Sequence, residues 1–160
     1  AAIKLVPIMV GSLSTAAEKQ LGELLVPTLN DEISLIVISS DFCHWGDRFG
    51  YQYYDKSKGE IWQSIEALDR RGMQLVASHD IVTWHQYLRQ YRNTICGRHP
   101  IGVLLAAVTA TAAPSTTTTF VKYAQSEHCH HISDSSVSYA SALTTLNGSG
   151  SGSGGGGGAA

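Results

Sequence analysis

The 160-residue sequence lacks several features that would assign it to a common class of protein. Its apolar residues make up 43% of the chain but never form the unbroken run of about eighteen that a membrane-spanning helix needs, so we expect no membrane insertion. Basic residues are not in excess, with 11 Lys and Arg against 13 Asp and Glu, which argues against nucleic acid as a partner. The chain does not open with a secretory signal peptide, which would show a charged segment, an apolar segment and a cleavage site. We therefore predict a cytoplasmic protein.

Cysteine is also scarce. Cys43, Cys96 and Cys129 are odd in number and widely spaced, which argues against a disulfide framework. Such a set favours free thiols or metal ligands, so the surroundings of each cysteine are the first place to look for chemistry.

The two ends of the chain differ from its middle. Residues 148–160 read GSGSGSGGGGGAA and contain no side chain large enough to pack. We therefore predict one domain over residues 1–146 and a flexible Gly/Ser-rich tail over residues 147–160. At the other end, two alanines lead directly into a strand-like run, which suggests that the chain begins inside a fold.

Two short apolar runs rich in β-branched residues, Ile3–Val10 and Ile33–Ser40, predict strands buried on both faces of a sheet. A helix is predicted between them, because Ser14 can cap its start, leucines follow at helical spacing and Pro27 ends the run. A strand, a helix and a strand in this order predict a right-handed βαβ unit.

The rest of the chain shows helix patterns followed by strand patterns. Helices are predicted over Ser57–Arg71, Asp80–Arg92 and Pro100–Ala110, and strands over Thr119–Ser126 and Ser135–Thr144. The stretch Ala112–Thr119 has the composition of a surface loop. We therefore predict an α/β fold with a mixed sheet of at least four strands, flanked by helices.

Three potential ligands, Asp41, Cys43 and His44, follow the second predicted strand. Open α/β sheets bind ligands beyond the carboxyl ends of their strands, so this segment is the first functional candidate. In an extended chain Asp41 and Cys43 point one way and His44 the other, so all three can bind one metal only if the chain turns. His44 suits both metal binding and proton transfer, whereas capping or packing explains Asp41 and Cys43 as well as ligation does.

Cys96 lies in a short connection just before a predicted helix. The helix dipole, Arg98 and His99 would favour the thiolate form, which metal ligation and nucleophilic chemistry both need. An inert buried cysteine is the alternative. Gly97 allows a ligand to approach the backbone closely, although a plain turn between two helices would also use a glycine.

For the other histidines and for three tyrosines, the sequence gives only weak indications of a functional role. The run His128–His131 has the composition of a metal tract, but an exposed loop between strands explains it better, since no second set of ligands stands at a defined spacing. His79 and His85 are expected to be structural. Tyr51, Tyr53 and Tyr54 either line a cleft or cover one end of the core.

Five segments carry a family resemblance. They are SSDFCHWG at Ser39–Gly46, YYDKSKGEI at Tyr53–Ile61, NTICGRHPIGVLL at Asn93–Leu105, YAQS at Tyr123–Ser126 and DSSVSYA at Asp134–Ala140. Together they resemble the Memo family, over about Ile3 to Leu146. The family is about twice as long, so the resemblance implies that an amino-terminal half, needed to complete the fold, is missing here.

The resemblance has specific implications for the fold and the site. Memo proteins are similar in fold to the class III extradiol dioxygenases and hold a metal with two histidines and a cysteine. Cys96 matches that cysteine and is the candidate metal ligand. His44 and Asp41 match residues of the same pocket and are the candidate catalytic residues. Because the two histidines would lie in the missing half, we expect weak or no metal binding, and no enzyme activity, from this chain alone.

The resemblance also implies a function. It implies a copper- or iron-binding protein with a redox role, which acts as an effector of receptor-tyrosine-kinase signalling to cell motility. The alternatives are a non-catalytic module that binds a phosphotyrosine peptide or a receptor-derived segment, and an inactive fragment. Arg48 and Arg98 are candidates for a phosphate contact, with surface solvation as the other interpretation.

Overall fold

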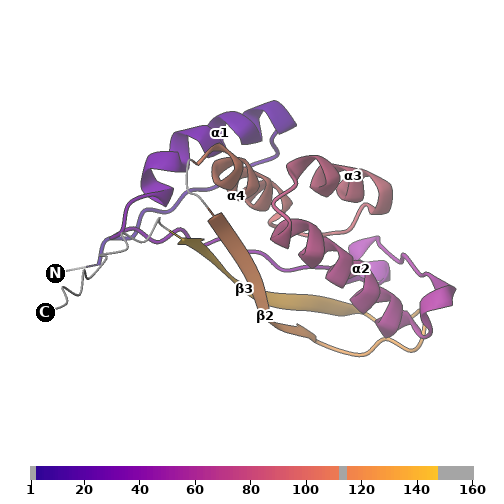
Figure 1. Cartoon of the computed structure of the whole chain (residues 1–160). Coiled ribbons are helices and arrows are strands. Elements are labelled where there is room, and N and C mark those ends of the chain that lie inside the picture. Colours follow the sequence, from indigo (N-terminus) through magenta and orange to yellow (C-terminus); the bar gives the residue numbers. More distant parts are fainter. Residues whose placement is uncertain (1–2, 112–114, 148–160) are drawn as a thin grey trace, which may run out of the picture.

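A computed structural model describes residues 3–111 and 115–147 (Figure 1). Four α-helices lie in this part: α1 (Thr15–Leu29), α2 (Ile61–Ala77), α3 (Ile81–Tyr91) and α4 (Arg98–Ala110). Two short 3-10 helices span Asp47–Phe49 and Lys56–Lys58. All four predicted helices are confirmed, with shifted ends. α1 continues past Pro27, and α2 begins at Ile61 because Ser57 belongs to the second 3-10 helix.

Side-chain caps fix where the helices begin. Ser14 accepts a hydrogen bond from the backbone N–H of Ala17 at the start of α1. Asp80 accepts two backbone N–H groups at the start of α3. Glu60 and Gln63 form a capping box that starts α2. These local bonds explain why sequence patterns located the helices well.

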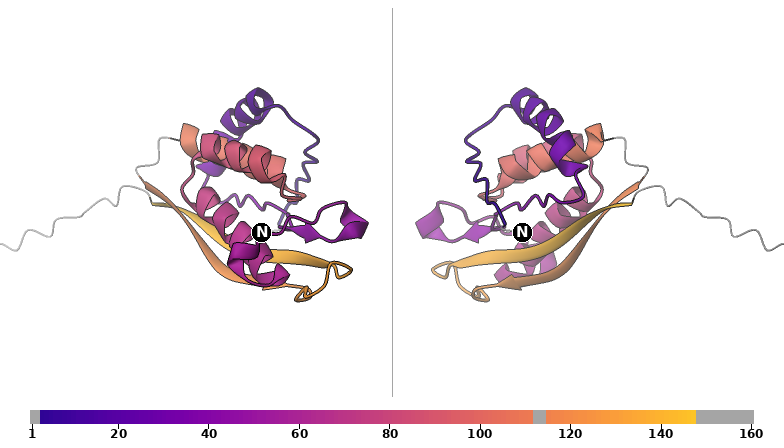
Figure 2. Two further views of the ribbon diagram at one scale, coloured as in Figure 1. Left: turned by 90° about the vertical axis from the view of Figure 1, so that its right-hand side faces the viewer. Right: turned by 90° about the vertical axis from the view of Figure 1, so that its left-hand side faces the viewer.

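The described residues form a three-stranded antiparallel sheet. β2 (Ser115–Gln125) and β3 (Ser136–Asn147) pair as a long hairpin, and the two-residue strand β1 (His44–Trp45) pairs with β3. The strand order is β1-β3-β2. All four helices lie on one face of the hairpin, and α2 is the helix nearest to it (Figures 1 and 2).

The α/β class and the two carboxyl-terminal strands are confirmed. The sheet is antiparallel among the described residues, whereas a mixed sheet of at least four strands was expected. The loop predicted over Ala112–Thr119 is wrong for residues 115–119, which open β2, and residues 112–114 lie outside the described residues. The predicted tail lies outside them too, apart from Asn147 at the end of β3.

The core lies between the hairpin and the helices. Its larger buried cluster includes Trp84, Tyr87 and Leu105, and a smaller one includes Trp45 and Ile65. The central helix is α4, which is buried on most sides. None of the helices in the described residues is long and apolar enough to cross a membrane.

Two predicted strands do not form in the described part. Residues 3–13 and 31–41 pair with no strand, so the predicted βαβ unit is wrong. Most of their apolar side chains are exposed, and Ile33 is 95% exposed. Ile38 is partly buried and packs against the larger core cluster. Figure 2 shows the two segments as coils that lead into and out of α1. β-branched residues favour extended backbone, but a strand also needs a neighbour that satisfies its N–H and C=O groups.

Candidate functional site

Asp41, His44 and Cys96 converge at one place in the structure. A carboxylate oxygen, an imidazole nitrogen and the sulfur of these residues all lie within 4.8 Å of one another. Asp41 and His44 come from the segment that enters β1, and Cys96 comes from the connection between α3 and α4. The tertiary structure thus brings together the predicted catalytic residues and the predicted metal ligand.

The entry into β1 directs the side chains of Cys43 and His44 apart. Cys43 is fully buried in the smaller core cluster, whereas His44 lies beside Asp41. The chain turns enough for Asp41 Oδ2 to lie 3.7 Å from His44 Nε2. The sequence left open whether Cys43 packs or ligates, and in this geometry it packs.

Thr94 fixes the backbone of His44. Its hydroxyl accepts a hydrogen bond from His44 N and donates one to His44 O, both at 2.8 Å. Because Thr94 lies two residues before Cys96, the same short connection supplies one candidate ligand and holds another in place.

The sulfur of Cys96 accepts a backbone hydrogen bond. The N–H of Asp41 lies 3.0 Å from it, and N–H donors stabilise negative charge on sulfur. Gly97 N donates to the hydroxyl of Ser40 at 2.9 Å, and a side chain at Gly97 would overlap Ser40. Gly97 therefore lets the two candidate ligand segments approach each other closely.

The other two cysteines are protonated thiols in the core. Burial, reinforced by the Asp69 carboxylate, raises the pKa of Cys43 far above its usual range. Burial also raises the pKa of Cys129 to about 11, with a contribution from Asp134. All three cysteines are free, and Cys96 is the exposed one. Cys96 is therefore the thiol available for ligation.

The imidazole of His44 offers an unused nitrogen. Its Nε2 is buried, yet it has no hydrogen-bond partner among the described residues. Buried polar atoms without a partner are rare in folded proteins and ask for an explanation. A metal ion that accepts the nitrogen lone pair is one explanation, and thiolate, imidazole and carboxylate together suit copper or iron. The residues present therefore fit such an ion.

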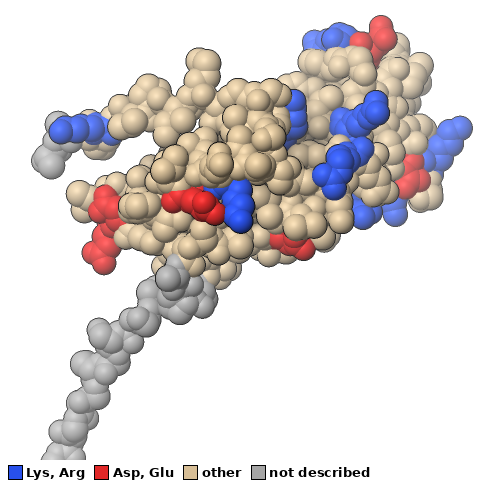
Figure 3. All heavy atoms as spheres, turned by 90° about the horizontal axis from the view of Figure 1, so that it is seen from above, with Lys and Arg blue, Asp and Glu red and all other residues tan. Residues whose placement is uncertain are grey.

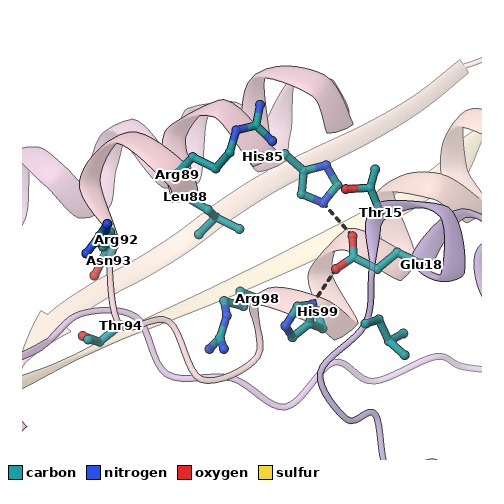
Figure 4. A pocket seen from close by; sticks show the side chains of 11 residues that line it. Thr15, Glu18, His85, Leu88, Arg89, Arg92, Asn93, Thr94, Arg98 and His99 are labelled. Atoms are coloured by element: carbon teal, nitrogen blue, oxygen red, sulfur yellow. Dashed lines mark hydrogen bonds and ion pairs between the residues drawn. The ribbon is translucent and has the colours of Figure 1, made fainter.

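A second cluster of ionisable groups joins α1, α3 and α4. Glu18 is 2% exposed, and its two carboxylate oxygens each lie 2.6 Å from a histidine nitrogen, His85 Nε2 and His99 Nδ1 (Figure 4). The cluster opens into a cavity of about 510 Å³. Sequence reasoning treated His85 as structural and missed Glu18, because the histidines lie 67 and 81 residues away along the chain and no local spacing links them.

Arg89, Arg92 and Arg98 line the same cavity. Among the described residues, none of the three lies within ion-pair distance of a carboxylate. Figure 4 shows their side chains at separate places around the cavity, so they do not converge on one point. On the face seen in Figure 3, basic and acidic side chains are interspersed and form no large patch of one sign. Arg48, the other phosphate candidate, lies over the ring of Phe49.

The remaining candidates have structural surroundings. The run His128–His131 lies between β2 and β3, as predicted, but its Cys129 is buried. His130 pairs with Glu60 at 2.6 Å. Tyr51 and Tyr53 pack against the core, which fits the covering role. Among the described residues, the only group of three or more His, Cys, Asp or Glu donors close enough to hold one metal is Asp41, His44 and Cys96.

Comparison with known proteins places the chain in a family. A family model described as Memo-like protein matches residues 1–143. Protein MEMO1 of Homo sapiens and that of Rattus norvegicus are each 49% identical over 145 residues, covering 89% of this chain and 49% of their own length. A MEMO1 family protein of Schizosaccharomyces pombe is 38% identical over 158 residues, covering 88% of this chain and 51% of its own length. The chain thus spans about half the length of the curated relatives it matches, and it belongs to the Memo family.

Proposed function

We propose that this chain supplies three ligands, Cys96, His44 and Asp41, to a copper or iron site with a redox role. The observation that carries the proposal is the convergence of the three donor atoms within 4.8 Å, beside a buried His44 nitrogen that lacks a hydrogen-bond partner. Family membership supports the choice of copper or iron. The free state of all three cysteines supports a reducing, cytoplasmic setting.

The three residues would have different roles. Cys96 would bind through its thiolate, held in place by the Asp41 N–H, and His44 would bind through Nε2. A copper or iron ion bound here would supply one-electron chemistry. Asp41 is partly exposed, so its carboxylate can either complete the ligand set or accept a proton from a group that enters from solvent.

We expect further ligands to come from a segment outside this chain. Three donors leave coordination positions open, and the relatives are about twice as long as the matched region. Because metal affinity depends on several converging ligands and on the groups that hold them, the chain alone is expected to bind copper weakly.

Titration with Cu(I) in competition with a chelator tests the proposal. The unmodified chain should bind one Cu(I), Cys96→Ala should lose the binding, and His44→Ala should weaken it. His131→Ala changes an exposed histidine outside the three-ligand group, so it should bind like the unmodified chain. Copper binding that persists in Cys96→Ala would contradict the proposal.

A second candidate function is recognition of a phosphotyrosine peptide, as part of receptor-tyrosine-kinase signalling to cell motility. The observation that favours it is the set of three cavity arginines without a carboxylate partner among the described residues, since guanidinium groups bind phosphate well. Fluorescence titration should show that a phosphorylated tyrosine peptide binds more tightly than its unphosphorylated form, and Arg98→Ala should reduce the difference. Equal binding of both peptides would exclude this function.

A further inference from the structure

The two segments that carry the three ligand atoms have little regular structure. Residues 41–44 contribute only His44 to a strand, and residues 93–96 lie in the connection between α3 and α4. At the site itself they are joined by the Thr94 hydroxyl and by the hydrogen bond from Asp41 N to Cys96 Sγ. A ligand geometry of this kind depends on what holds both segments from the protein interior.

Asp69, on α2, lies behind both segments and is 0% exposed. One carboxylate oxygen accepts a hydrogen bond from Asn93 Nδ2 at 3.0 Å, and the other accepts one from the hydroxyl of Tyr123 at 3.0 Å. The backbone N–H of Cys43 and the hydroxyl of Ser138 also face the carboxylate and stabilise its charge. One side chain thus touches both ligand segments and both strands of the hairpin.

The position of these partners along the chain is specific. Cys43 is the residue before His44, and Asn93 is the residue before Thr94, whose hydroxyl holds the His44 backbone. Asp69 therefore connects α2 to the backbone next to one ligand and to the segment that ends in Cys96. Asp69 is buried in the protein interior, whereas Cys96 is exposed.

Burying a carboxylate at this position is energetically unfavourable compared with burying an apolar side chain. Burial raises the pKa of Asp69 to about 6, although hydrogen bonds from Ser138, Asn93 and Tyr123 oppose the increase. An apolar side chain of similar volume would pack here without that cost. Directional acceptors, by contrast, fix the distance and angle between the groups that donate to them.

We propose that Asp69 is a positioning residue for the three-ligand site: it holds residues 41–44 and 93–96 in the register that brings Asp41, His44 and Cys96 together. This role rests on the proposed metal site. The competing interpretation is that Asp69 only stabilises the core. The two interpretations make different predictions: under a positioning role, loss of the hydrogen bond from Asn93 lowers metal affinity more than loss of the one from Tyr123.

Two substitutions that each remove one hydrogen bond to Asp69 separate these interpretations. Asn93→Ala removes the partner in a ligand segment, and Tyr123→Phe removes the partner on β2. A positioning role predicts that Asn93→Ala lowers Cu(I) affinity about 10–100-fold, as for other groups that orient metal ligands, while Tyr123→Phe leaves it nearly unchanged. Asp69→Asn should lower the affinity at least as much as Asn93→Ala. Urea unfolding of each variant shows whether it remains folded under the titration conditions.

Copper affinities that fall equally in Asn93→Ala and Tyr123→Phe, or in neither, would overturn the positioning role. If Asp69→Asn does not fold, the comparison of the other two variants still decides. If the unmodified chain itself binds no copper, the proposed function fails, and the rate at which Cys96 reacts with a thiol reagent decides instead. Asn93→Ala should change that rate through loss of the Asp41 N–H contact, whereas Tyr123→Phe should not. An equal rate in both variants would then overturn the positioning role.

Discussion

Two regions of this chain have similar apolar sequences and opposite surroundings. In the body, which comprises residues 42–111 and 115–147, apolar side chains such as Leu105 are buried between helices and hairpin. In the flanking segments, residues 3–13 and 31–41, most of the equally apolar side chains face solvent, such as Ile3, Leu5 and Ile33. The difference teaches that an apolar pattern creates a tendency to be buried, while a packing partner decides whether burial occurs.

Helix α1 lies between the flanking segments but packs as part of the body. At Gly22 a β-carbon would lie only 2.6 Å from the Cβ of Ala106, so α1 and α4 approach each other more closely than larger residues permit. The Glu18 carboxylate adds the two contacts to His85 and His99. Helix α1 therefore belongs to the body and separates the two flanking segments.

The largest expected effect is the difference in unfolding free energy between two matched leucine substitutions, one in the body and one in a flanking segment. Leu105 is 1% exposed and Leu35 is 82% exposed. Leu105→Ala should lower the free energy of unfolding by about 2–5 kcal/mol, because it leaves a cavity in the core. Leu35→Ala should change it by less than about 0.5 kcal/mol. Urea unfolding measures both, and a similar loss in the two variants would abolish the distinction between body and flanking segments.

The contribution of the buried Asp69 to the free energy of unfolding is expected to change by about 3 kcal/mol with pH. Burial raises the pKa of Asp69 from its ordinary value of 3.8, which applies to the unfolded chain, to about 6 in the folded chain. The folded state therefore binds the proton more tightly than the unfolded state. The contribution of Asp69 to stability is therefore greatest below about pH 4 and falls as the pH rises to about 6. The difference in unfolding free energy between the unmodified chain and Asp69→Asn should shrink over this window. A difference that stays constant with pH would contradict the buried, perturbed carboxyl group.

The attachment of α1 to the body is expected to depend on Glu18. Glu18→Gln should cost about 1–3 kcal/mol, because one of the two buried histidine contacts loses its acceptor. Backbone amides of α1 should then exchange with solvent faster than those of α4. Glu23→Gln, on the same helix, is the control. Glu23 is exposed, and its ion pair with Lys19, at 3.9 Å, contributes little because it lies in solvent. Equal exchange in the two variants would show that helix packing alone holds α1.

The smallest effect on stability is expected in the flanking segments. Ile33→Lys and Leu35→Lys together should leave the free energy of unfolding nearly unchanged, since both side chains are already in solvent. The same change should reduce self-association, because exposed apolar segments attract one another. Sedimentation velocity at several concentrations measures this. A large loss of stability would mean that these segments are packed after all.

Local chemistry made the helices and the hairpin strands predictable. Ser14, Asp80 and Glu60 cap helices through bonds to residues two or three positions away, so their effect can be found in a short window of sequence. The flanking segments show the limit of this approach. Their β-branched residues predict extended backbone, but a strand is defined by a neighbour that no local pattern identifies.

The candidate site divides in the same way. From the sequence alone, Cys96 could be placed before a helix, because that position follows from its own neighbours. His44 and Asp41 were expected at the end of a strand over Ile33–Ser40 that does not form, and the structure places them at the entry to β1 instead. The family resemblance put Cys96, His44 and Asp41 in one pocket, and the tertiary structure brings their donor atoms within 4.8 Å. Only the tertiary structure decided that Cys43 turns into the core and that Asp69 and Glu18 are buried among distant partners. The physical reason is that hydrogen bonds, burial and ligand distances depend on which segments are packed together, and chain separation says little about that packing.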